Sequence, residues 1–132
     1  MKYGISLLTL VLIILLSFGC RKKNSAGTGG ENDLQITAKH HTVILDSMTV
    51  YVKFNAQDAP TSLSEYDMQT TVQDYAGENI AIFTNLKKGD YYLYGKGWDP
   101  SLPGVVEGGL PIEIKNESGT IEYDLQVTED GH

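Results

Sequence analysis

The fold class is decided by one stretch near the C-terminus, Thr120-Ile121-Glu122-Tyr123-Asp124-Leu125-Gln126-Val127. Its apolar residues are separated by single polar or charged residues. Successive side chains of a β-strand point to opposite faces of the sheet, so this alternation predicts a strand with one buried and one solvated face.

The same period of two recurs along the chain from residue 33 onward. Candidate strands fall at residues 34–38, 48–54, 68–72, 79–84, 91–94 and 110–114, and most are separated by turn-forming residues. No stretch has a sustained helical period, although residues 62–66 suit a single helical turn. With residues 120–127 this makes about seven strands, which predict an all-β fold: an antiparallel seven-stranded β-sandwich of immunoglobulin-like architecture over residues 33–132.

Residues 1–19 have the layout of a bacterial signal peptide. The apolar run at residues 5–16 is shorter than the roughly 20 residues that cross a bilayer. Its end, Leu16-Ser17-Phe18-Gly19-Cys20, resembles the lipobox of bacterial lipoproteins, whose cysteine is diacylated after removal of the preceding peptide. The resemblance implies lipid attachment at Cys20, the only cysteine, which leaves no thiol for a disulfide or for catalysis. The alternative is an uncleaved signal anchor with an incidental cysteine.

Residues 20–32 predict a flexible linker between the lipid and the domain. They lack apolar periodicity and are rich in glycine and small polar residues, and such a chain spans on the order of 20 Å. Arg21 is not the aspartate of an inner-membrane retention signal, and the linker lacks an acidic cluster of the kind associated with surface export. We therefore expect an outer-membrane lipoprotein that faces the periplasm, with surface exposure as the alternative.

The charge distribution argues against nucleic acid as a partner. The chain has 10 basic and 17 acidic residues, and four of the basic ones precede residue 24. The remainder has 6 basic and 17 acidic residues, a net charge of −11. Binding to phosphates needs clustered lysine and arginine, which this part of the chain lacks.

A second resemblance lies in the middle of the chain. Leu86, Gly89 and Tyr91 have the spacing of a tyrosine corner, a tight turn in which the tyrosine hydroxyl bonds to upstream backbone. Together with Gly77 and Phe83 they resemble prealbumin-like domains, which include transthyretin, carboxypeptidase regulatory-like domains and the B-type repeats of collagen-binding surface proteins. The resemblance implies a β-sandwich that serves as a stalk, spacer or binding module rather than as an enzyme.

Some collagen-binding repeats contain an isopeptide bond between lysine and asparagine. The resemblance would assign Lys39 or Lys53 with Asn116 to this bond. Asn116 falls in a predicted hairpin turn, however, and no buried acid can be assigned to assist the reaction. We therefore do not expect the bond to form.

No metal site or catalytic centre is predicted. His40 and His41 are adjacent, with Asp46 nearby and His132 at the chain end, but neighbouring residues of a strand point to opposite faces and would not bind one ion together. The acidic residues lack the spacing of a calcium loop, and no nucleophile stands in a recognisable catalytic motif. We expect no metal, no cofactor and no enzymatic activity.

The aromatic residues Tyr92, Tyr94 and Trp98 are the candidate ligand-binding residues. Tyr91 and Leu93 are expected to face the core, which places Tyr92 and Tyr94 on the opposite face, near a loop that holds Trp98. Such side chains stack on sugar rings or anchor a protein partner. The simpler alternative is packing of a small aromatic cluster beneath the loop.

These observations favour a lipid-anchored cell-envelope protein, attached to the membrane at Cys20, whose sandwich is a non-enzymatic accessory or binding module for an envelope protein or glycan. One alternative is a carbohydrate- or other ligand-binding module that uses the exposed aromatics. A less favoured alternative is a small hydrolase that uses loop carboxylates.

Overall fold

The computed structural model describes residues 25–129, so the signal peptide, Cys20 and the first part of the linker lie outside the described residues. The strands are β1 (Thr28–His40), β2 (Val43–Ile44), β3 (Met48–Phe54), β4 (Met68–Thr71), β5 (Gln73–Tyr75), β6 (Glu78–Leu86), β7 (Gly89–Asp99), β8 (Gly104–Ile114) and β9 (Ser118–Val127). The 3-10 turn η1 (Leu63–Glu65) confirms the helical turn predicted there. No helix in the described part is long and apolar enough to cross a membrane.

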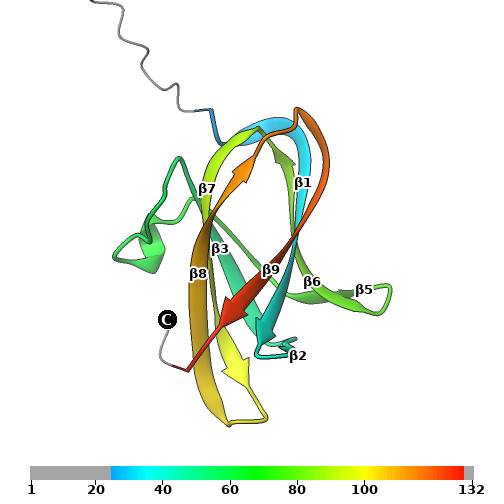
Figure 1. Cartoon of the computed structure of the whole chain (residues 1–132), viewed down its shortest axis with the longest axis vertical. Helices are drawn as coiled ribbons and strands as arrows, with labels where there is room; N and C mark the ends of the chain where they lie inside the picture. The colour runs from blue at the N-terminus through cyan, green and yellow to red at the C-terminus, as the bar shows by residue number, and fades with distance from the viewer. Residues whose placement is uncertain (1–24, 130–132) are drawn as a thin grey trace, which may run out of the picture.

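Two sheets form the domain, as Figure 1 shows, and the all-β fold is confirmed. One sheet has the order β2-β1-β6-β5 with β9 also paired to β1, and the other has the order β4-β3-β7-β8. The expected count of seven strands is wrong, because residues 25–129 form nine strands and an isolated bridge between Glu107 and Thr128. The strands that were missed, β2 and β5, have two and three residues, too few for an alternation to be visible.

One pairing departs from the expected antiparallel arrangement. β9 runs parallel to β1, from Ser118 beside Glu31 to Val127 beside His40. The predicted hairpin turn at this point is therefore wrong. Residues 115–117 carry the chain from β8 in one sheet to β9 in the other. The buried Asn32 holds this crossing, because its Nδ2 donates to the Asn116 carbonyl oxygen at 2.9 Å.

The core lies between the sheets and is built from alternate residues of the long strands. In β9, Leu125 and Val127 are buried while Ile121 and Tyr123 on the same face are partly buried, which confirms the alternation that predicted this strand. Burying one large apolar side chain contributes about 1.5–3 kcal/mol. The apolar side chains with no exposed surface are Leu34, Ile36, Ala38, Val50, Val52, Ala81, Leu86, Tyr91, Leu93, Val106 and Leu125.

The folded domain begins earlier than the expected residue 33. β1 starts at Thr28, so part of the predicted linker is a paired strand. Gly30 explains the misreading, because a Cβ at this position would lie 2.2 Å from the Leu86 carbonyl oxygen. Only glycine allows the two backbones to approach so closely here. In the sequence, a glycine-rich segment of this kind is typical of a flexible tether.

Candidate functional site

The predicted tyrosine corner is present and also fastens the N-terminal segment. The Tyr91 hydroxyl donates to the Lys87 carbonyl oxygen at 2.6 Å, and it accepts from the Gly27 N–H at 3.0 Å. Burial of the ring raises the pKa of Tyr91. Gly89 adopts a φ of 147°, which permits the turn at the start of β7. This corner therefore fixes the point at which the chain enters the domain.

Tyr92 and Tyr94 lie on the outer face of β7, as predicted, but they are partly buried. The Tyr94 ring stacks on Tyr66 with centroids 5.8 Å apart, and its hydroxyl donates to Glu107 at 2.6 Å. Tyr51 packs against both of these rings. Desolvation raises the pKa of Tyr94 and of Tyr66, the latter to about 12. Tyr51, Tyr66 and Tyr94 thus form a packed cluster, in which Tyr66 comes from the segment that joins β3 to β4.

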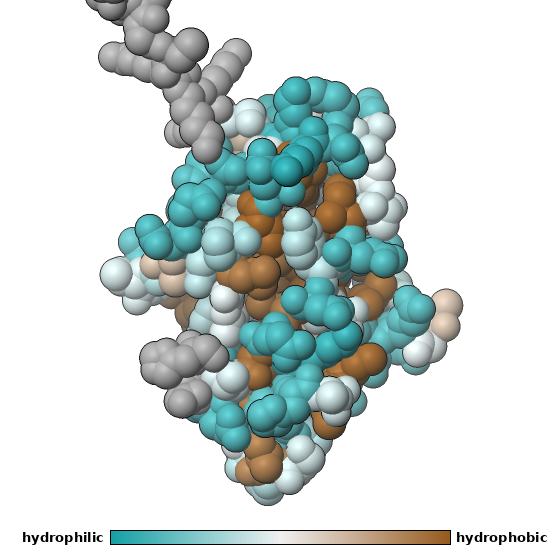
Figure 2. Space-filling view, viewed as in Figure 1, coloured by the Kyte–Doolittle hydropathy of each residue, from teal (hydrophilic) through white to brown (hydrophobic). Residues whose placement is uncertain are grey.

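Trp98 lies farther along β7 and is separate from this cluster. It is 47% exposed and lines a shallow hollow of about 480 Å³ together with Met48, Thr49 and Lys96, while neither Tyr92 nor Tyr94 lines it. Leu102, on the connection from β7 to β8, and Val105, near the start of β8 and paired with Trp98, are also about half exposed. Figure 2 shows apolar surface at this end of the molecule. The structure therefore does not bring the three predicted aromatics into one binding platform.

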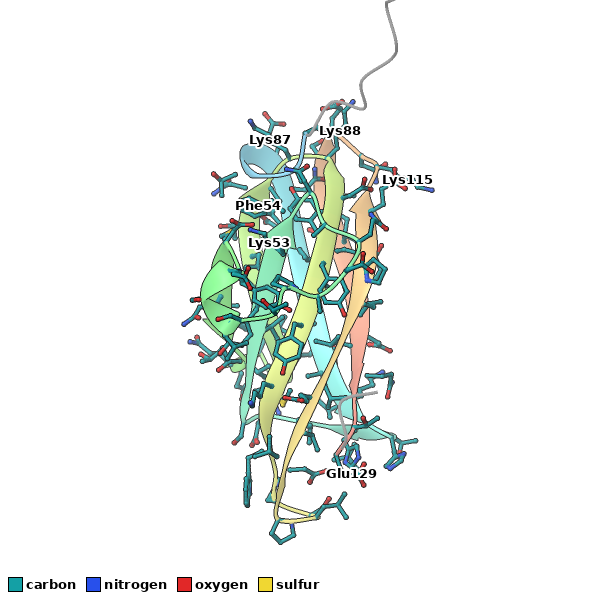
Figure 3. The ribbon with its side chains drawn as sticks, turned by 90° about the vertical axis from the view of Figure 1, so that its left-hand side faces the viewer. Lys53, Phe54, Lys87, Lys88, Lys115 and Glu129 are labelled. Atoms are coloured by element: carbon teal, nitrogen blue, oxygen red, sulfur yellow. The ribbon has the colours of Figure 1, made fainter. Side chains whose placement is uncertain are left out.

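A buried histidine lies at the same end of the sandwich. His40, the last residue of β1, places its Nδ1 2.6 Å from Oδ2 of Asp99, the last residue of β7. Its Nε2 lies 3.2 Å from Oε2 of Glu129, just after β9. Both His40 and Asp99 are buried, whereas Glu129 is exposed. Figure 3 places Glu129 near one end of the domain, with Lys87 and Lys88 at the other.

The hydrogen bonds of this cluster shift the pKa of each member. The bond to Asp99 raises the pKa of His40. Bonds from Ser101 and His40 lower the pKa of Asp99 to about 2, with Ser101 as the larger cause. A backbone hydrogen bond, helped by His40, lowers the pKa of Glu129. Each shift favours the charged form of its group, and the hydrogen bonds join the ends of β1, β7 and β9.

His41 does not point away from His40 as the strand argument predicted. It follows β1 with a φ of 55°, so the alternation of strand side chains has already ended there. The two ring centroids lie 4.4 Å apart.

The other residues considered for a metal site are Asp46 and His132. Asp46 accepts a hydrogen bond from Ser47, and His132 lies outside the described residues. Sequence reasoning considered both adjacent histidines but missed Asp99 and Glu129, because nothing local marks these acids as partners of a distant strand end.

The comparisons with known proteins identify no relative. The chain matches no protein-family model, no curated protein sequence and no solved structure. The site must therefore be interpreted from its own geometry.

The cluster lacks the arrangement of a serine-histidine-aspartate triad. Ser101 Oγ donates to Asp99 Oδ1 at 2.6 Å, and its N–H binds the same oxygen at 2.8 Å, so this hydroxyl is bonded to the acid and not to the imidazole. A triad needs the nucleophile on the other nitrogen of the histidine. That nitrogen faces Glu129. The geometry can hold a proton or a cation, and it provides no activated nucleophile among these residues.

The lysines considered for an isopeptide bond make ion pairs instead. Lys39 Nζ lies 2.6 Å from Asp124, and Lys53 Nζ lies 3.3 Å from Asp67. Asn116 is in the connection between β8 and β9, outside any strand.

The His40–Asp99 pair predicts a stability optimum at mildly acidic pH in buffer that contains a chelator. The raised pKa of His40 adds stability that is complete below the ordinary value of 6.5 and is lost as pH rises through the raised value. The lowered pKa of Asp99, about 2, adds stability that is complete above the ordinary value of 3.8 and is lost as pH falls toward 2. We expect the Tm, measured by circular dichroism, to be highest between about pH 4 and pH 6.5.

The variant His40→Gln tests this origin of the pH dependence. Its Tm is expected to fall less between pH 6 and pH 9 than that of the wild type, because no imidazolium is present to lose. His41→Gln, at an exposed position, is the matched control and should keep the wild-type profile. An unchanged profile in His40→Gln would contradict the assignment.

Proposed function

We propose that the chain is a lipid-anchored protein of the bacterial outer membrane whose prealbumin-like sandwich is a non-enzymatic binding module facing the periplasm. One observation carries the binding role: exposed apolar side chains gather at the end of the sandwich opposite the entry of the N-terminal segment. Trp98, Leu102 and Val105 form this surface, which we call the distal tip. Exposed apolar residues that lie together mark interaction sites more often than scattered ones do.

The geometry suits a tethered module. The chain enters beside Lys87, whose N–H donates to the Gly27 carbonyl oxygen at 2.8 Å. From this end β7 runs for 11 residues to Asp99, on the order of 35 Å at about 3.3 Å per residue. A lipid attached at Cys20 would hold the entry end toward the membrane and leave the distal tip farthest from it.

The prealbumin-like assignment is supported by the tyrosine corner and by the two packed sheets. Prealbumin-like domains serve mainly as spacers and binding modules. The resemblance of this chain to them supports a binding role through the fold alone and does not identify a site. The ion pairing of Asp99 adds a local argument. The contact with His40 fixes Asp99, the residue that directly follows Trp98. A rigid backbone at this point lowers the entropy lost when an aromatic anchor binds a partner.

We favour an envelope protein as the partner, and a photocrosslinking amino acid at Val105 tests this in cells. The expected result is one adduct of defined mass, identified by mass spectrometry. Trp98→Ala should reduce its yield at least about tenfold, since a central aromatic anchor contributes about 2 kcal/mol or more to binding.

A crosslinker at Tyr75 is the matched control, because this side chain is 43% exposed on the hairpin of β5 and β6, away from the distal tip. It should give no such adduct. The same adduct from Tyr75, or a yield that Trp98→Ala leaves unchanged, would rule out the distal tip as the contact surface.

A glycan is the second candidate partner, because the hollow beside Trp98 combines an aromatic wall with the polar residues Asp46 and Lys96. Trp98 is the only tryptophan, so its fluorescence reports directly on this hollow. Titration with soluble peptidoglycan fragments should then quench or shift the emission with saturation. If the emission does not change with added fragments while the protein adduct described above forms, the partner is a protein and not a glycan.

A further inference from the structure

We propose that His40, His41 and Glu129 form a binding site for a divalent transition-metal ion, with Zn²⁺ as the best match. One ligand atom from each residue lies within 4.8 Å of the others. Two imidazoles and a carboxylate, with a fourth position open to water, make a ligand set that zinc sites commonly use. The histidines come from the end of β1 and Glu129 from the end of β9.

The orientation of His40 is the strongest argument for the site. Its Nδ1 is 2.6 Å from Asp99, and Asp99 is in turn held by Ser101. Histidines that bind metals usually donate the N–H of their other nitrogen to a carboxylate, which fixes the ring and its tautomer. In this arrangement Nδ1 carries the hydrogen, and Nε2 is directed at the position between His40 and Glu129.

The contact between His40 and Glu129 requires a proton or a metal ion between the two facing atoms. Nε2 of a neutral His40 with its hydrogen on Nδ1 is an acceptor, and a carboxylate oxygen is also an acceptor. At a separation of 3.2 Å, two acceptors repel unless a proton or a metal ion lies between them. A metal ion that replaces this proton would satisfy both groups, and it would add His41 as a further ligand.

The distances allow a metal after a small movement. Zinc bonds of about 2.0–2.2 Å in a tetrahedron place ligand atoms about 3.4 Å apart. Both His41 and Glu129 are exposed, so these two side chains can close by the remaining distance. His40 is buried and its ring is held by Asp99. One fixed ligand and two adjustable ligands are sufficient to form the site on binding.

A purely structural role of the cluster is the competing explanation, and His41 separates the two. The hydrogen bond of His40 to Asp99 joins the ends of β1 and β7, and the exposed His41 imidazole makes neither end of that bond. A metal site needs that imidazole as a ligand. Loss of His41 should therefore leave folding intact and weaken metal binding.

The test is isothermal titration calorimetry of the full chain without a histidine tag, purified in mild detergent and freed of metal with a chelator. We expect one Zn²⁺ per chain and an increase in Tm on its addition. His41→Ala and Glu129→Gln should each weaken binding at least about tenfold and abolish most of the Tm increase. Asp99→Asn should weaken it about 10- to 100-fold.

Two controls complete the test. His132→Ala removes the third histidine of the chain and should leave the affinity unchanged, as should Asp46→Asn. Mg²⁺, which prefers an octahedral set of oxygen ligands, should not compete with Zn²⁺. Absence of saturable Zn²⁺ binding would overturn the proposal, and so would an affinity that His41→Ala and Glu129→Gln leave unchanged while His132→Ala lowers it.

Discussion

Replacing Tyr91 with alanine is expected to lower the free energy of unfolding by about 3–5 kcal/mol, the range for removing a large aromatic side chain from a core. The ring has no exposed surface, and it packs edge-on against Phe54 with centroids 5.8 Å apart. Its hydroxyl joins the Lys87 carbonyl to the Gly27 backbone. Urea denaturation followed by circular dichroism measures the loss.

Tyr91→Phe separates the hydroxyl from the ring. It is expected to cost about 1–3 kcal/mol, because a buried donor and acceptor lose their partner while the ring remains. Residues 25–30 should also become more sensitive to limited proteolysis, since Gly27 is released from the corner. Tyr75→Phe, at an exposed position, is the matched control and should be nearly neutral. A neutral Tyr91→Phe would mean that the hydroxyl does not hold the N-terminal segment.

The parts of the fold that were predicted correctly depend on local signals. Alternation over several residues identified the long strands, although β7 and β8 extend beyond the predicted residues 91–94 and 110–114, and Trp98 lies in β7 instead of the predicted loop. The spacing of Leu86, Gly89 and Tyr91 identified the corner. The capping residues Ser62 and Glu65 likewise form the predicted turn within a few positions of each other. Each of these features is decided by residues that are close in sequence, so the pattern carries the information.

The errors concern contacts between distant segments. Parallel pairing of β9 with β1 joins residues 87 positions apart, and no turn in the sequence marks it. The early start of β1 has a related cause, because Gly30 is explained only by Leu86 on the neighbouring strand. Glycine-rich sequence is compatible with a tether and with close packing, and only the tertiary contact distinguishes them.

The candidate sites show the same limit. Alternation correctly placed Tyr92 and Tyr94 on the outer face of β7, but it could not show that the segment after β3 places Tyr66 against Tyr94. The network of His40, Asp99 and Glu129 is assembled by three strand ends that converge. His41 was misplaced because one residue with a positive φ ends the regular alternation.

Replacing Cys20 with alanine is expected to move the protein completely out of the outer-membrane fraction. Cys20 lies outside the described residues, and the expectation comes from the resemblance of residues 16–20 to a lipobox. Each buried methylene of an acyl chain contributes about 0.8 kcal/mol, so two or three chains hold a protein firmly while none remains in the variant. Fractionation of a Gram-negative host and intact mass measurement of both proteins test this. The wild type should carry the acyl mass and lack residues 1–19.

Ser25→Ala is the matched control, because it changes a residue after the lipobox-like segment and keeps the thiol. It should be acylated and fractionate like the wild type.

Protease treatment of whole cells then reports the orientation of the domain. Protection of the domain until the outer membrane is opened supports the periplasmic side, and cleavage in intact cells supports the surface. If Cys20→Ala remains in the membrane with the uncleaved signal peptide, as the wild type does, the attachment is not a lipid. An uncleaved signal anchor would still hold the entry end toward a membrane, but the outer-membrane location would lose its basis, and the binding role would depend on the exposed Trp98 surface alone.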